Sequence, residues 1–275
     1  MTANDPPASG FVDIGQGRLY YEVAGHGPAV VLIHAGIADS RMWDDQFASL
    51  AQSYRVVRYD MRGFGRTEPG SEPFSDWRDL TRLLEHLELS RVVVVGVSMG
   101  ARVAVEFALE QPESVGGLVL VSPGLFGDEP RSDALVAGWR QIEAAFDAGD
   151  IERAIDIESD LWVVGPTREP ETVSAHVRRR VREMNARVWE LEEASGGRVT
   201  MSPPAVSRLA EIQVPALVIA GQNDQSDILD VADRLAREID GAENVIIENA
   251  AHMLTMEQPG RFSDVLIGFF KNLKW

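Results

Sequence analysis

The sequence contains no cysteine. Disulfide bonds, thiolate metal ligands and a cysteine nucleophile are therefore excluded. The first ten residues also lack the basic and apolar segments of a secretory signal. No apolar run approaches the roughly 20 residues that a membrane-spanning helix needs. We expect a cytoplasmic protein that neither crosses nor binds a membrane, although the absence of cysteine only fits this location and does not require it.

Basic residues are also few, because 26 lysines and arginines stand against 43 acidic residues, for a net charge of −17. A surface of this charge repels the phosphate backbone of a nucleic acid. Nucleic acid is therefore not an expected partner, and a small molecule is. Hydrophobic residues make up 45% of the 275 residues, which is ordinary for a globular protein.

Short runs of valine, isoleucine and leucine alternate with helical patterns along most of the chain. The runs are continuous rather than alternating, which is typical of strands buried on both faces. Strands and helices in alternation predict an α/β fold with a mainly parallel central sheet and helices on both faces. The expected strands include 18–25, 29–36, 54–60, 91–98, 115–124, 215–221 and 243–249, and the expected core helices include 77–89, 99–112, 227–240 and 260–273.

From about residue 125 to residue 205 the alternation stops, and the sequence contains helical spacing without a strong strand. We interpret this segment as a helical cap, or lid, inserted after the sixth strand. The predicted organisation is a flexible tail over 1–10, a core made of 11–124 and 206–275, and a cap over 125–205.

The stretch "GVSMG" places Ser98 between an expected strand and an expected helix. Such a serine can stand on a strained turn that only small neighbours permit, here Gly96 and Gly100. The amide of Met99 lies at the helix N-terminus, where partial positive charge gathers and an oxyanion can be stabilised. Ser98 is therefore our candidate nucleophile, and a merely tight turn is the alternative.

A serine nucleophile needs a base, and the base needs a carboxylate to orient it. His252 follows the last expected strand, and Asp224 follows the strand before it, both at carboxyl ends, where such sheets collect functional groups. The order Ser98, Asp224, His252 fits a hydrolase triad. Three other aspartates remain open as the carboxylate: Asp128, Asp227 and Asp230.

Taken together, five segments resemble the α/β-hydrolase superfamily in identity and order. These segments are His34 with its neighbours, "YDMRGFGRT", "GVSMG", "GQND" and "AAHM", and the resemblance spans about residues 12–272. It implies a second oxyanion amide at Gly36, with Ile37 as the alternative because Ala35 replaces the usual glycine. It also implies structural roles for His34, Asp60 and Arg62, and it implies no metal and no cofactor.

The cap must select the substrate. Residues that can line an apolar pocket above Ser98 are Ile37, Leu125, Phe126, Trp139, Trp162, Met184 and Trp189, and packing of helix on helix explains each of them equally well. The basic run Arg178, Arg179, Arg180 and Arg182 is expected to pair with Glu183, Glu190 or Glu192. One member of this run is an alternative candidate for binding a substrate carboxylate.

The sequence therefore predicts a cofactor-free serine hydrolase that acts on a small carboxylic ester or lactone through an acyl-enzyme. The resemblance extends to esterases, 3-oxoadipate enol-lactonases, carbon–carbon bond hydrolases and cofactor-free haloperoxidases. Because these proteins share fold and triad, the triad alone does not choose among them. A small-molecule receptor with slow turnover is the alternative from a different class.

Overall fold

A computed structural model describes residues 7–15, 17–124, 132–191 and 196–275. Its centre is an eight-stranded sheet in the order β1-β2-β4-β3-β5-β6-β7-β8. Strands β3 to β8 pair in parallel, and β1 and β2 pair antiparallel at one edge. The strands are β1 (Ala8–Asp13), β2 (Arg18–Ala24), β3 (Ala29–Ile33), β4 (Arg55–Tyr59), β5 (Val92–Val97), β6 (Val115–Val121), β7 (Ala216–Gly221) and β8 (Glu243–Ile247).

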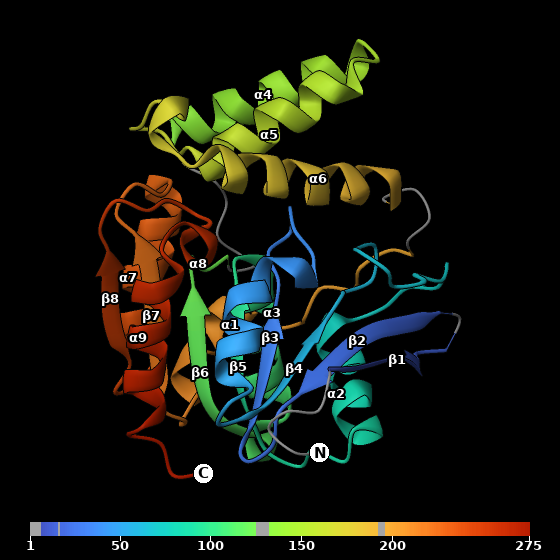
Figure 1. The fold of residues 1–275 in the computed structure, drawn as a ribbon, viewed down its shortest axis with the longest axis vertical. Coiled ribbons are helices and arrows are strands. Elements are labelled where there is room, and N and C mark those ends of the chain that lie inside the picture. The colour runs from blue at the N-terminus through green and yellow to red at the C-terminus, as the bar shows by residue number, and fades with distance from the viewer. Residues whose placement is uncertain (1–6, 16, 125–131, 192–195) are drawn as a thin grey trace.

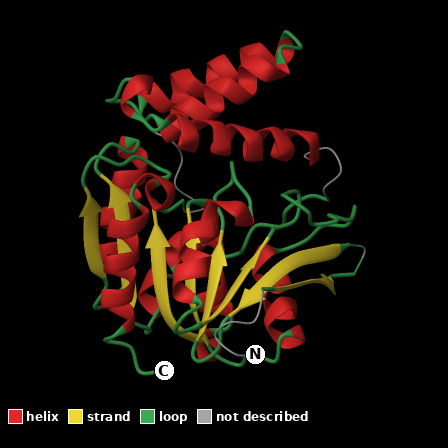
Figure 2. Cartoon of the chain, in the orientation of Figure 1, coloured by secondary structure: helices red, strands yellow, loops and turns green. Residues whose placement is uncertain are grey.

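Helices cover both faces of the sheet, as Figure 2 shows. Side chains alternate along each strand, so Val31 faces one apolar layer and Val30 faces the other. The first layer is closed by α2 (Asp76–His86), α3 (Met99–Glu110) and α7 (Ser226–Glu238), and the second by α1 (Asp44–Leu50) and α9 (Pro259–Phe270). The predicted fold class is confirmed, with a core on each side of the sheet.

In the described part of the segment between β6 and β7, three α-helices lie beyond the carboxyl edge of the sheet (Figure 1). These are α4 (Asp133–Asp147), α5 (Ile151–Val163) and α6 (Ala175–Leu191). Val163 and Val181 from this cap belong to the same buried cluster as Ile37 from the core. The cap therefore packs on the sheet edge where the candidate residues were expected.

The first strand corrects one predicted boundary. Residues 8–10 were assigned to a flexible tail, but β1 begins at Ala8 and pairs with β2 through Ala8 and Val23. Glycine and small residues hid this strand, because only Val12 of its side chains is buried. Short helices complete the described chain: α8 (Leu254–Glu257) and single 3-10 turns at Ser40–Trp43, Pro112–Ser114, Pro170–Thr172, Ala205–Ser207 and Leu209–Glu211.

None of the helices in the described ranges is both long enough and apolar enough to span a bilayer.

Candidate active site

Ser98 occupies the turn between β5 and α3 with φ +55° and ψ −112°. Positive φ is costly for a residue with a side chain, so the surrounding structure must hold it. A Cβ atom at Gly96 would lie 2.2 Å from the Gly100 carbonyl oxygen, and one at Gly100 would lie 2.4 Å from the carbonyl oxygen of Ile33. Both glycines are therefore required by the close approach of strand and helix, which holds Ser98 on its strained turn.

Asp224 and His252 meet in the loops that follow β7 and β8. The Asn223 amide donates to the Ala250 carbonyl at 2.9 Å, which joins the two loops. His252 Nδ1 lies 3.1 Å and 3.0 Å from the two carboxylate oxygens of Asp224, and the residues are only 2% and 3% exposed. The carboxylate thereby selects the Nδ1–H tautomer, which leaves Nε2 with a lone pair to accept a proton.

The structure brings Asp224 and His252 into contact and places Ser98 at the same edge of the sheet. Backbone hydrogen bonds from Ser98 N to Val121 O (2.9 Å) and from Ser122 N to Ile219 O (2.7 Å) join the ends of β5, β6 and β7. Among the described residues, the Ser98 hydroxyl makes no hydrogen bond to His252. Such contacts are often long in a ligand-free hydrolase and shorten when substrate binds.

The rival carboxylates lie elsewhere. Asp227 is in the first turn of α7, and its Oδ1 accepts the Ser132 amide at 3.0 Å, at the start of the cap. Asp230 lies further along α7, and Asp128 lies outside the described residues. Of the described candidates, Asp224 contacts His252 in the structure.

A loop after β3 passes beside the elbow and carries Gly36. A Cβ atom at Gly36 would lie 2.9 Å from the Met99 Cε, so this loop and the start of α3 are neighbours. The Ala35 carbonyl accepts the Ala38 amide at 3.1 Å and His34 Nδ1–H at 2.8 Å. Because that carbonyl belongs to the same peptide unit as the Gly36 N–H, these bonds fix the direction of the candidate oxyanion donor.

His34 is held from its other nitrogen as well, because Nε2 accepts the Met61 amide at 3.0 Å. The ring also meets Phe64 edge to face with centroids 4.8 Å apart. Asp60 and Arg62 likewise tie loops together: Asp60 accepts the Ser40 amide, and Arg62 pairs with Asp79. None of these three side chains contacts the Asp224–His252 pair within the described hydrogen bonds, so they support the site rather than react.

Burial lowers the pKa of His34, so the imidazole stays neutral in the folded protein when it would be protonated in the unfolded chain. Below about pH 6.5 the unfolded state then binds more protons, and the free energy of unfolding should fall by up to about 1.4 kcal/mol per pH unit. We expect thermal melts between pH 8 and pH 5 to show this loss. In His34→Gln the loss should be smaller, and an equal loss in both proteins would contradict the assignment.

The cap reaches the triad through the end of α5. The ring of Trp162 lies 4.5 Å from the ring of His252, centroid to centroid. Gln225, next to Asp224, donates through Nε2 to the Leu161 carbonyl at 2.9 Å. Trp162 therefore lies against the histidine ring.

A largely buried ion pair between Arg168 and Glu257 stabilises the loop that carries His252. The sequence did not reveal this pair. Glu257 Oε1 accepts the Ala251 amide at 2.9 Å, directly before His252, and its Oε2 accepts Arg168 Nη1 at 2.7 Å. Arg168 also donates to the carbonyls of Val163 and Val164 at the end of α5. This pair therefore joins the cap to the loop that holds the base.

A pocket of about 390 Å³ opens beside the elbow between cap and core. It is lined by Trp189, which is one of the candidate substrate-pocket residues, by the candidate oxyanion residues Met99 and Gly36, and by Phe64, Phe74 and Val188. Its charged wall residues are Arg62, Arg198 and Glu158, of which Arg198 and Glu158 were not singled out from the sequence. An isolated arginine in "GGRVT" and one glutamate of an acidic helix carry no pattern that marks them.

The other predicted pocket residues are placed differently. Ile37 and Met184 are buried in the apolar cluster that joins core and cap. Trp139 is 45% exposed and lines a groove of about 780 Å³ among the cap helices, because α4 packs on α5 away from the sheet. This groove shares Glu158 and Trp189 with the pocket beside the elbow. Leu125 and Phe126 lie outside the described residues.

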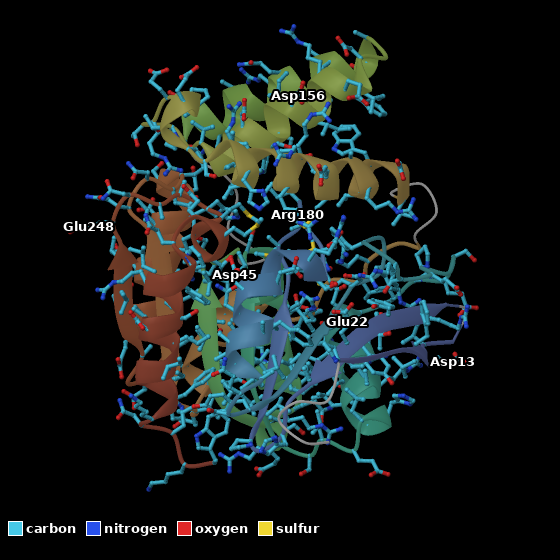
Figure 3. The ribbon with its side chains drawn as sticks, viewed as in Figure 1. Asp13, Glu22, Asp45, Asp156, Arg180 and Glu248 are labelled. Carbon is cyan, nitrogen blue, oxygen red and sulfur yellow. The ribbon has the colours of Figure 1, made fainter. Side chains whose placement is uncertain are left out.

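Within the described residues, the basic run on α6 pairs with acidic residues other than the expected Glu183 and Glu190, and Glu192 lies outside the described residues. Arg178 pairs with Asp160, and Arg182 pairs with Glu152 and Asp156. Arg180, which Figure 3 shows between cap and core, pairs with Asp44. Arg179 lies against His176 on the exposed side. Within the described residues, His, Asp and Glu side chains form no group of three or more that can hold a metal ion.

Comparisons with known proteins show which family and which folds the chain resembles. The model of the Alpha/beta hydrolase family matches residues 30–265. A 2-hydroxy-6-oxononadienedioate/2-hydroxy-6-oxononatrienedioate hydrolase of Pseudomonas putida is 28% identical over 98% of both chains. Est816, an N-acyl homoserine lactone degrading enzyme, superposes with a TM-score of 0.76 at 25% identity over 94% of this chain and 100% of its own. A malate-bound thermophilic esterase from Thermogutta terrifontis superposes with a TM-score of 0.74 at 26% identity, over 96% of this chain and 98% of its own.

Proposed function

Because this chain belongs to the alpha/beta hydrolase family, we propose that it is a serine hydrolase that cleaves a small carboxylic ester or lactone. One observation carries the proposal: a serine held at φ +55° on a strand-to-helix turn shares its sheet edge with a buried histidine–aspartate pair. The likeness to Est816 and to the Thermogutta esterase supports the choice of lactone or ester.

The proposed reaction gives each of these residues one role. Ser98 Oγ attacks the substrate carbonyl carbon while His252 Nε2 takes the hydroxyl proton, and the carbonyl π electrons move to oxygen. The amides of Met99 and Gly36 stabilise this oxyanion. His252 returns the proton to the leaving alkoxide, which departs as an alcohol. Water then repeats the sequence on the acyl-enzyme and releases the acid.

Hydrolysis of a carbon–carbon bond next to a ketone is the second candidate. The observation that favours it is the Pseudomonas putida relative, which matches over nearly the whole chain and is named for a 2-hydroxy-6-oxo-dienedioate. The same serine, histidine and amides serve such a reaction, because it too needs a polarised carbonyl and a proton donor for the departing group.

A substrate panel distinguishes the candidates. We expect multiple turnovers of short p-nitrophenyl esters or of five- and six-membered lactones, with kcat/KM at least about 10⁴ M⁻¹s⁻¹ for the best of them, in the ordinary enzyme range. Hydrolysis of a carbon–carbon bond is tested with a 2-hydroxy-6-oxo-2,4-dienoate, whose loss of absorbance reports its cleavage. Fast turnover of the dienoate with negligible ester or lactone turnover would overturn our proposal. Tight binding with only slow turnover throughout would instead support a receptor.

A further inference from the structure

We propose that Arg198 is a carboxylate-binding subsite of the pocket beside Ser98, so that the substrate is an ester or lactone that carries a free carboxylate. The inference rests on the proposed function for the reacting bond, whereas the anion site itself depends only on the pocket and its arginine. Arg198 lies in the segment that returns from the cap to β7, outside the basic run of α6.

The backbone around Arg198 is fixed to the core. The Phe74 amide donates to the Gly197 carbonyl at 3.1 Å, and the Val199 amide donates to the Phe74 carbonyl at 2.7 Å. A Cβ atom at Gly196 would lie 2.0 Å from the carbonyl oxygen of Glu72, so this segment lies directly against the loop before α2. Arg198 is thus presented from a rigid edge rather than from a free loop.

The guanidinium group is oriented by two contacts that use only one of its donors. Nε donates to Asp76 Oδ2 at 2.6 Å, and the group lies over the ring of Phe74, 5.2 Å from its centroid. Asp76 Oδ2 also accepts Arg102 Nη2 at 2.8 Å. Because Arg102 Nη1 also lies 3.3 Å from Glu106 Oε1, two buried carboxylates face these two guanidinium groups, and Asp76 is shared between them.

The Nη donors of Arg198 remain available for a ligand. Within the described part of the chain they make no hydrogen bond, and the side chain is 26% exposed. Arg62, the other arginine of the pocket, differs because its Nη atoms donate to Asp79 and to the carbonyls of Ile14 and Pro69. The flat pair of Nη groups matches the two oxygens of a carboxylate.

The position of Arg198 relates the anion site to the chemistry. Its pocket is bounded by Gly36 and Met99, the two residues whose amides are the candidate oxyanion donors. A substrate with its carbonyl at these amides extends into about 390 Å³, enough for a few carbon atoms and a terminal carboxylate on Arg198. The carboxylate then fixes the orientation of the substrate.

Glu158 is a carboxylate in the wall of the same pocket and must be reconciled with an anionic ligand. Its Oε2 accepts Trp189 Nε1 at 2.8 Å and Asn185 Nδ2 at 2.9 Å, so two donors from α6 hold and partly offset its charge. It comes from the cap, whereas Arg198 comes from the core side. We therefore place the ligand carboxylate on the Arg198 side of the pocket and the more electropositive groups of the ligand on the cap side.

Matched substrates test the subsite. The p-nitrophenyl monoester of glutaric acid and its methyl-capped diester differ by one charge. In Arg198→Gln we expect kcat/KM for the acid to fall about 10- to 100-fold, as for loss of a charged hydrogen bond, and kcat/KM for the diester to stay within about twofold. Arg182→Gln removes the same charge from an exposed ion pair of the cap and should change kcat/KM for neither substrate. Glu158→Gln should raise the preference for the acid.

Binding gives a second readout that needs no turnover. We expect glutarate, titrated by calorimetry into Ser98→Ala protein, to bind at least about 10-fold more weakly when Arg198→Gln is added, and unchanged when Arg182→Gln is added. The subsite would be overturned if Arg198→Gln lowered kcat/KM for the acid and the diester to the same degree. It would also be overturned if the affinity for glutarate did not change in Arg198→Gln. If no ester or lactone is turned over while glutarate binding depends on Arg198, the proposed function fails and the subsite stands.

Discussion

Ser98→Ala is expected to lower kcat by about 10⁶-fold, the loss recorded when the nucleophile of subtilisin is removed. The change removes only the hydroxyl group, whose oxygen must form the acyl-enzyme. A fluorophosphonate should transfer one phosphonyl group to Ser98 of the wild-type protein, with loss of fluoride and the hydroxyl proton as HF, and should add nothing to the variant. Peptide mass spectrometry locates the adduct, and thermal melts check that the backbone strain at φ +55° is still supported.

Ser122 offers a matched control for this experiment. It also has a positive φ, +41°, and directly follows the neighbouring strand β6, and its buried hydroxyl has no hydrogen-bond partner among the described residues. It differs in that no helix begins directly after it. The fluorophosphonate should therefore label Ser98 in the Ser122→Ala variant at the wild-type rate. An adduct on Ser122, or undiminished labelling of Ser98→Ala, would remove the nucleophile on which the proposal depends.

The core could be predicted because its signals are local. Four consecutive valines end at Gly96, and the helix pattern starts at Met99, so the elbow was determined within a few residues. Parallel strands also bring their carboxyl ends to one edge, so Asp224 and His252 could be paired from their places after β7 and β8. The structure adds the 3.0 Å contact between them.

The pocket could not be predicted in the same way, because it depends on how helices and loops pack. Helical spacing identified α4, but it does not say whether Trp139 faces the sheet or a groove of the cap. Arg198 lies in a short loop, and only the contacts with Phe74 and Asp76 place it at the pocket. Likewise Glu257 is one acidic residue among many until its buried contacts with Arg168 and Ala251 are known.

Asp224→Asn is expected to lower kcat by about 10⁴-fold, by analogy with the same change in a serine protease. An asparagine fills the same space, but its amide group can donate to Nδ1 of His252 and so favour the wrong tautomer. The Nε2 atom would then carry the proton and could not accept one from Ser98. Because the Gln225 amide also donates to Asp224 Oδ1 at 2.8 Å, the side chain should keep its position, and the loss should appear in kcat rather than in stability.

Asp227→Asn is the matched variant, three residues away. The Asp227 Oδ1 atom accepts the Ser132 amide at the start of the cap, and an asparagine oxygen can accept it equally. We expect kcat within about threefold of wild type and a stability loss of at most about 1 kcal/mol, the value of an ordinary hydrogen bond. Both variants should be compared by burst titration at equal folded fraction. If Asp227→Asn is the inactive protein and Asp224→Asn is nearly normal, the 3.0 Å contact between Asp224 and His252 is structural, and the triad acid is Asp227.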